Sequence, residues 1–142
     1  MKATTIRAFL FLICAALPLY AADLSDLTYD ASDATVIITD CDTAASGALV
    51  IPETIKGKPV TSIGLSAFWD CTNLTSVIIP EGVTSIGDQA FWGCRSLTNV
   101  TLPNSITNIG NLAFHHCSSL PNVTIPDSVT SIGDRPSFNV PA

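Results

Sequence analysis

Four cysteines are the residues of this sequence best suited to chemistry, and three of them recur at one step. Cys71, Cys94 and Cys117 follow one another by 23 residues (94 − 71 and 117 − 94), and Cys41 extends the series upstream. Such thiols could pair as disulfides or act as nucleophiles. Stacked strands hold parallel side chains ~4.8 Å apart, whereas a disulfide needs converging Cβ atoms about 3.8 Å apart. We therefore expect buried, free thiols in acidic and apolar surroundings that do not activate a nucleophile.

Metal chemistry has weaker support. His115 and His116 are the only histidines, and adjacent side chains on a helical turn diverge instead of sharing a metal. Six of the twelve acidic residues fall between Asp23 and Asp42, without the spacing of a calcium loop. A nucleotide-binding loop, a nucleophile elbow and paired carboxylates at a recurring position are also missing from the sequence. The sequence thus predicts no catalytic residue, metal site or cofactor, and a metal-dependent hydrolase is only a remote alternative.

A repeated phrase must position whatever functional residues exist. VTSIGLSAFWDC begins at Val60, and related phrases begin at Val83 and Ile106, each 23 residues after the last (83 − 60 and 106 − 83). A fourth copy begins at Val129 and breaks after six residues. A fixed period in this range is typical of a solenoid, in which each coil covers the apolar face of the next.

Each repeat predicts a strand, a turn and a short helical segment. Apolar residues at the first, fourth and sixth places predict strands over 74–79, 97–102 and 120–125, each ended by a proline. A second apolar pair and a glycine follow, and then an Ala-Phe pair whose phenylalanine we expect in a stacked core column. Three polar side chains should cap the helical segments: Asp88, Asn111 and Asp134.

Two surfaces of this coil remain free to vary with function. The outward columns of the strands run along the predicted concave sheet, where solenoids usually bind their partners, and carry small, neutral side chains. An aromatic strip follows the phenylalanines and could stack on a sugar or a protein. The possible ligand surface consists of Ser76, Ile78, Asn99, Thr101, Asn122, Thr124, Trp69, Trp92 and His115.

The first 21 residues have the pattern of a secretory signal peptide. Lys2 and Arg7 precede an apolar run that is shorter than a membrane span and contains Pro18. The whole chain has six Lys+Arg and twelve Asp+Glu. Cleavage would leave 4 − 12 = −8, a charge that repels nucleic acid and anionic membranes. We expect a secreted or cell-surface protein without membrane insertion after cleavage.

At this point the chain resembles a known family. The phrase IGxxAFxxCxxLxxVxIP at a 23-residue step is similar to the BspA-type leucine-rich repeats. The resemblance implies a right-handed coil with a parallel sheet on the concave face and short helical turns on the convex face. It also implies a non-catalytic module for adhesion to an extracellular protein or glycan. We place an N-terminal capping hairpin and lead-in at 22–48 and the repeats at 49–134, with full units near 60–82, 83–105 and 106–128.

The end of the sequence departs from the pattern. Pro136 takes the alanine place of the fourth unit and Ser137 the phenylalanine place, so we interpret 135–142 as an irregular, truncated tail. An alternative function follows, a structural remnant of a larger surface protein that has no ligand of its own. Solenoid ends need caps, and an uncovered C-terminal coil could associate with a second copy.

Overall fold

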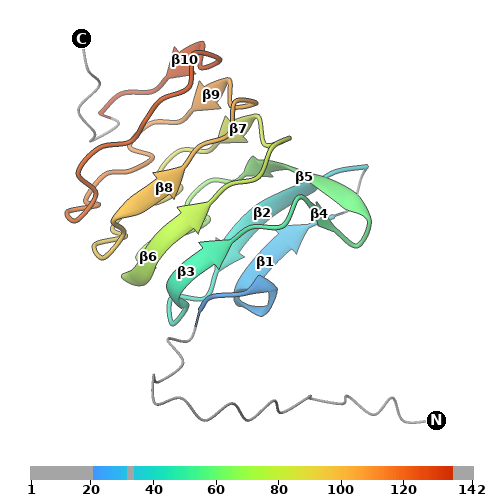
Figure 1. The fold of residues 1–142 in the computed structure, drawn as a ribbon, viewed down its shortest axis with the longest axis horizontal. Helices are drawn as coiled ribbons and strands as arrows, with labels where there is room; N and C mark the ends of the chain where they lie inside the picture. The colour runs from blue at the N-terminus through green and yellow to red at the C-terminus, as the bar shows by residue number, and fades with distance from the viewer. Residues whose placement is uncertain (1–20, 32–33, 136–142) are drawn as a thin grey trace.

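The chain is a stack of coils whose strands form two sheets (Figure 1). The computed structural model describes residues 21–31 and 34–135, so the predicted signal peptide and the Pro136 region lie outside it. The elements in chain order are the 3-10 helix η1 (Leu24–Asp26) and the strands β1 (Leu27–Asp30), β2 (Val36–Cys41), β3 (Ser46–Val50), β4 (Thr54–Ile55), β5 (Lys58–Ile63), β6 (Asn73–Ile78), β7 (Ser85–Ile86), β8 (Asn99–Thr101), β9 (Asn108–Ile109) and β10 (Ser131–Ile132). The predicted repeat solenoid is therefore confirmed. Among the described residues, no helix is long and apolar enough to span a bilayer.

The larger sheet runs along the whole stack in the order β1-β2-β5-β7-β9-β10, with β4 attached to β5. β1 pairs antiparallel with β2, and the pairs from β2 to β10 are parallel. Ser85 lies opposite Ser62 on one side and Asn108 on the other, so equivalent residues of successive repeats are neighbours. The sequence analysis did not predict this sheet, because strands of two residues are too short to show an alternating pattern.

The smaller sheet has the order β3-β6-β8 (Figure 1). β6 and β8 correspond to the strands predicted over 74–79 and 97–102. The third strand, predicted over 120–125, is not formed. The smaller sheet therefore ends at β8, one coil before the larger sheet ends at β10.

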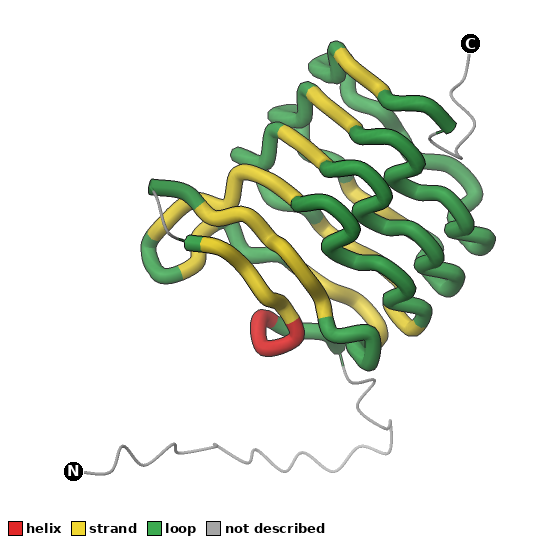
Figure 2. Tube along the Cα trace, turned by 180° about the vertical axis from the view of Figure 1, so that it is seen from behind, coloured by secondary structure: helices red, strands yellow, loops and turns green. Residues whose placement is uncertain are grey.

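The segments after the repeat glycines are turns, which corrects the prediction of short helices. Figure 2 shows η1 as the one helix of the described chain. Phe68 N–H donates to the carbonyl of Ala90 in the next coil at 2.7 Å, whereas Trp69 N–H donates to Ser66 at 3.0 Å. Ser66 and Asp70 also have left-handed φ angles of 53° and 54°. Because alternate N–H groups bond to the next coil, a continuous helical ladder cannot form.

The predicted helix caps bond between coils as well. Asp88 Oδ1 accepts hydrogen bonds from the backbone N–H and the side-chain amide of Asn111, at 2.7 and 3.2 Å. Asn111 Oδ1 accepts from the N–H of Asp134 at 2.9 Å. These three residues form a polar ladder along the stack, and they do not cap a turn of their own coil. Leu65 occupies the equivalent place in the first full coil and is 67% exposed.

The core is a set of columns that run through the stack. Phe68, Phe91 and Phe114 are fully buried, and the ring centroids of successive phenylalanines are 4.7 and 5.2 Å apart. The predicted phenylalanine column is confirmed. Gly110 permits this close stacking, since a Cβ there would lie 2.5 Å from the backbone nitrogen of Asp88.

The five extra residues before the first full coil form a hairpin instead of an irregular surface loop. β4 and β5 pair antiparallel, with Ile55 opposite Lys58. Lys56 and Gly57 connect them with φ angles of 53° and 76°, and positive φ at both central residues suits a tight hairpin turn. Ile55 is buried, so the insertion contributes to the core.

Candidate functional site

The smaller sheet presents two columns of outward side chains in register. Ser76 lies between Ala48 and Asn99, and Ile78 lies between Val50 and Thr101. The structure thus brings together four of the sheet residues proposed as a ligand surface. Val50 and Ile78 are 61% and 43% exposed, which makes this end of the face apolar and the β8 end polar. Charged residues are missing from both columns over β3, β6 and β8.

Asn122 and Thr124 do not join these columns as a fourth strand. In the preceding coil, Thr98 donates both its N–H and its hydroxyl to the carbonyl of Thr75, at 2.8 and 2.9 Å. The residue 23 places later is Pro121, which has neither donor. No backbone hydrogen bond joins β8 to residues 120–125, although the structure describes both segments. The loss of these donors explains why the smaller sheet stops at β8.

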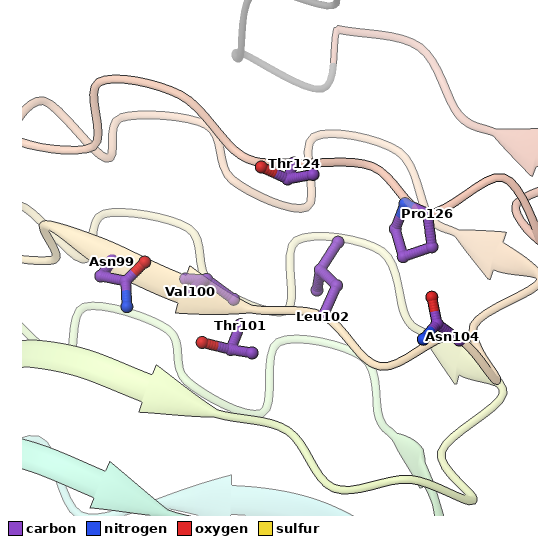
Figure 3. Close-up of a pocket in the computed structure, with 7 residues that line it drawn as sticks. All are labelled: Asn99, Val100, Thr101, Leu102, Asn104, Thr124 and Pro126. Carbon is purple, nitrogen blue, oxygen red and sulfur yellow. The ribbon is translucent and has the colours of Figure 1, made fainter.

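A pocket opens where the ladder stops (Figure 3). It has a volume of about 320 Å³ and lies between β8 and the unpaired segment that contains Thr124. Its polar side chains are amides and hydroxyls, its apolar side chains form part of the wall, and none of its lining residues is charged. The lining residues are Asn99, Val100, Thr101, Leu102, Asn104, Thr124 and Pro126.

The aromatic strip is a stack of rings and not a row of free ring faces. The rings of Trp69 and Trp92 are parallel within 2° with centroids 5.1 Å apart. His115 covers the other side of Trp92, with centroids 4.6 Å apart and a tilt of 49°. A flat ligand could therefore stack only on the outer face of Trp69, which is 39% exposed. The three residues are together as proposed, but most of their stacking surface is used within the protein.

The two histidines lie closer together than expected. Their ring centroids are 4.1 Å apart, and the ring of His116 also meets the edge of Trp92. Partial desolvation lowers the pKa of His115, and the charges of His116 and Arg135 lower it further. Within the described chain, no three or more His, Cys, Asp or Glu residues are grouped so that they could hold a metal ion.

The four cysteines of the series are buried and free, as predicted for the described part of the chain. Cys94 and Cys117 donate from Sγ to the carbonyls of Phe68 and Phe91, each at 3.0 Å. A hydrogen bond with the Cys117 thiol, followed by burial, raises the pKa of Cys94 far above its usual value. A hydrogen bond with the Cys71 thiol and burial do the same for the pKa of Cys41. Cys41 and Cys94 therefore stay neutral, which suits a core residue and not a nucleophile.

Comparison with known proteins follows this geometry closely. Residues 48–139 match the model of the BspA type leucine rich repeat region in 6 copies. The chain belongs to this family. A search among curated protein sequences gave no match.

Solved bacterial structures share the BspA-type fold of this chain. A leucine-rich repeat protein of T. pallidum is 32% identical, with a TM-score of 0.74 over 81% of this chain and 54% of that one. A leucine-rich cell surface protein of Faecalibacterium prausnitzii is 35% identical, with a TM-score of 0.69 over 78% of this chain and 32% of that one. A leucine-rich repeat protein of Bacteroides capillosus is 34% identical, with a TM-score of 0.70 over 80% and 87%. This chain thus spans about half of the T. pallidum protein and a third of the Faecalibacterium protein.

The pocket contains residues that sequence reasoning missed in this BspA-type repeat. Leu102, Asn104 and Pro126 were assigned no ligand role, because each has an ordinary structural place in the repeat. One signal was visible in the sequence: Pro121 lies inside a predicted strand, and a proline inside such a run argues against sheet pairing. Applied to residues 120–125, that rule predicts the unpaired segment.

Proposed function

We propose that this chain is a secreted or cell-surface module that binds an extracellular protein or glycan without catalysis. The observation that carries this proposal is the exposed face of β3, β6 and β8, where two columns of uncharged side chains lie in register beside a pocket. Repeat solenoids commonly present such extended faces to partners. The name of the Faecalibacterium neighbour, a cell surface protein, supports the location.

The chemistry of this face favours an uncharged ligand. Val50 and Ile78 provide exposed apolar area at one end, and Asn99 and Thr101 provide amide and hydroxyl groups at the other. A charged ligand would lose its hydration without gaining an ion pair in either column. Affinity should therefore come from several modest contacts spread over the face and not from one dominant residue.

A binding array tests the proposal. The purified chain is applied to immobilised extracellular matrix proteins and neutral glycans, beside the variants Ile78→Arg and Thr101→Arg. We expect at least a tenfold loss of binding in both, because each substitution places an uncompensated bulky charge on the face. Thr84→Arg is the matched control, since Thr84 is exposed beside the other sheet. Binding that survives these substitutions and also Trp69→Ala would contradict the proposal.

Secretion is tested separately. We expect mature protein in the extracellular or envelope fraction of the native cell, with an N-terminus near Ala22. Mass spectrometry of the purified native protein checks this. An intact Met1–Ala21 segment on a cytoplasmic product would contradict the predicted location.

A further inference from the structure

The edge of β8 lacks the partners that the same edge has one coil earlier. Between β6 and β8, Thr98 N–H donates to Thr75 C=O, and Ile79 N–H donates to Thr101 C=O at 3.2 Å. One repeat later, the equivalent bonds would join residue 121 to Thr98 C=O and Leu102 N–H to the carbonyl of residue 124. Pro121 has no N–H, and neither bond is formed among the described residues. One acceptor and one donor of the backbone thus remain without a ladder partner on this edge.

The segment opposite this edge is weakly attached. Residues 120–125 form no strand, and Val123 is the one member that is buried, at 3% exposure. The 320 Å³ pocket already separates Thr124 and Pro126 from β8 (Figure 3). Few native contacts would therefore be lost if another chain entered beside β8.

The spacing of the unpaired groups selects the kind of ligand. Thr98 and Leu102 are four residues apart, which is about 13 Å at the strand rise of ~3.3 Å per residue. A single sugar ring is too short to reach both groups. An extended peptide reaches both, because the paired strand one coil earlier uses an N–H and a C=O three residues apart, at Thr98 and Thr101. Main-chain groups in this order are what an added strand recognises.

We propose that the β8 edge binds an extended, uncharged segment of a partner protein as an additional parallel strand. This inference rests on the binding role proposed above and narrows it to a peptide at one edge. The peptide donates an N–H to Thr98 C=O and accepts from Leu102 N–H. Its inward side chain takes the place of Val123 and is apolar, as Val100 is in β8. Its outward side chains continue the columns of Asn99 and Thr101 and are polar and neutral.

A synthetic peptide with the sequence of residues 96–103 is the probe, because this strand already fits the preceding coil. The acetylated, amidated and fluorescently labelled peptide is titrated with the full chain, and binding is followed by anisotropy. Pro121→Thr restores the N–H and the hydroxyl that Thr98 uses one coil earlier, so the chain can pair with its own β8. We expect at least a tenfold loss of peptide affinity together with a higher melting temperature. Pro52→Thr is the matched control at a proline distant from the pocket and should bind like the wild type.

Two N-methylated peptides give a test that needs no protein variant. Methylation at the position of Thr98 removes the N–H that would bond to β8, whereas methylation at the position of Val100 alters an N–H directed away from it. We expect only the first peptide to lose affinity, by at least tenfold. Equal binding of both peptides would overturn the proposal, as would unchanged peptide affinity in Pro121→Thr. Displacement of the peptide by a methyl glycoside at similar concentration would overturn it in favour of a saccharide.

The two proposals fail differently. An array ligand that is lost in Ile78→Arg but bound normally by Pro121→Thr would leave the binding role in place and overturn the peptide site. Selective binding of the probe to β8, with no array ligand that depends on the sheet face, would support the peptide site and contradict the broader face.

Discussion

Single residues decide how much of each repeat is paired and how much is open. A threonine at position 98 supplies two donors to the preceding coil, and a proline 23 residues later supplies none. The same logic applies to the aromatic stack, which ends in His115 where the earlier repeats have Trp69 and Trp92. Changes at such positions alter local pairing without touching the core columns.

His115 should make stability depend on pH. Desolvation and the charges of His116 and Arg135 lower its pKa below the ordinary value of 6.5, so the folded state disfavours the protonated ring. The unfolded chain then binds more protons as the pH falls through 6.5 toward the folded pKa, and stability decreases in that window. His115→Trp removes this proton and extends the tryptophan stack. Melting temperatures at pH 7.5 and 5.5 should differ less in the variant, and an equal difference would contradict the argument.

The buried thiols should be inert in the native protein. Cys41, Cys71, Cys94 and Cys117 are at most 8% exposed, and burial of neutral thiols suppresses reaction with alkylating reagents. We expect iodoacetamide to label these four positions only at the rate at which the protein unfolds, and quickly in denaturant. Peptide mass spectrometry over a time course measures this. Rapid labelling of any of the four under native conditions would show that its column opens locally.

At the scale of elements, the stack is held by contacts between residues one repeat apart. The ladder of Asp88, Asn111 and Asp134 joins three turns by side-chain acceptors and backbone donors. The alternate N–H groups of the phenylalanine turns join the same coils a few residues later. These bonds replace the helical hydrogen bonds that the sequence pattern favours, because each turn lies directly against the next.

The polar ladder can be extended by one rung. Leu65→Asn places an amide oxygen where it can accept from Asp88 N–H, in the geometry that Asp88 and Asn111 use. We expect the free energy of unfolding to rise by about 0.5–1.5 kcal/mol, the usual contribution of one hydrogen bond. Leu65→Ala is the control, since it removes the exposed leucine and adds no acceptor. Denaturant melts that show no difference between the two variants would refute the added bond.

At the scale of the whole molecule, stability is shared between neighbouring coils. A repeat stack has contacts mainly between adjacent units, so its total stability is close to a sum of units and interfaces. The larger sheet continues to β10, whereas the smaller sheet ends at β8. Coils in the middle therefore have two paired neighbours in both sheets, and the last described coil has one.

Hydrogen exchange should follow this arrangement. We expect the slowest amide exchange within residues 83–105, for example at Phe91, whose N–H donates to Ala113. Exchange should be fastest within residues 118–135, where the smaller sheet is unpaired. Opening of an end unit costs less free energy than opening of a central one. Exchange measured by mass spectrometry that shows uniform protection over both ranges would indicate a single cooperative unit instead.

The sequence by itself determined the step of the stack, its family and its core. Residues such as Phe91 and Cys94 recur every 23 places because each coil must present the same apolar column to the next, and that constraint is written in composition and spacing. Burial of the thiols followed from the same reasoning.

Only the tertiary structure decided where the polar groups bond. Asp88 could cap its own turn or reach the next coil, and Phe68 N–H could bond within a helix or to Ala90. Both choices depend on a coil-to-coil distance that no local pattern contains. Pro121 shows the same limit, since its effect depends on the missing N–H having been directed at Thr98. The pocket beside β8 exists because that one bond between coils cannot form.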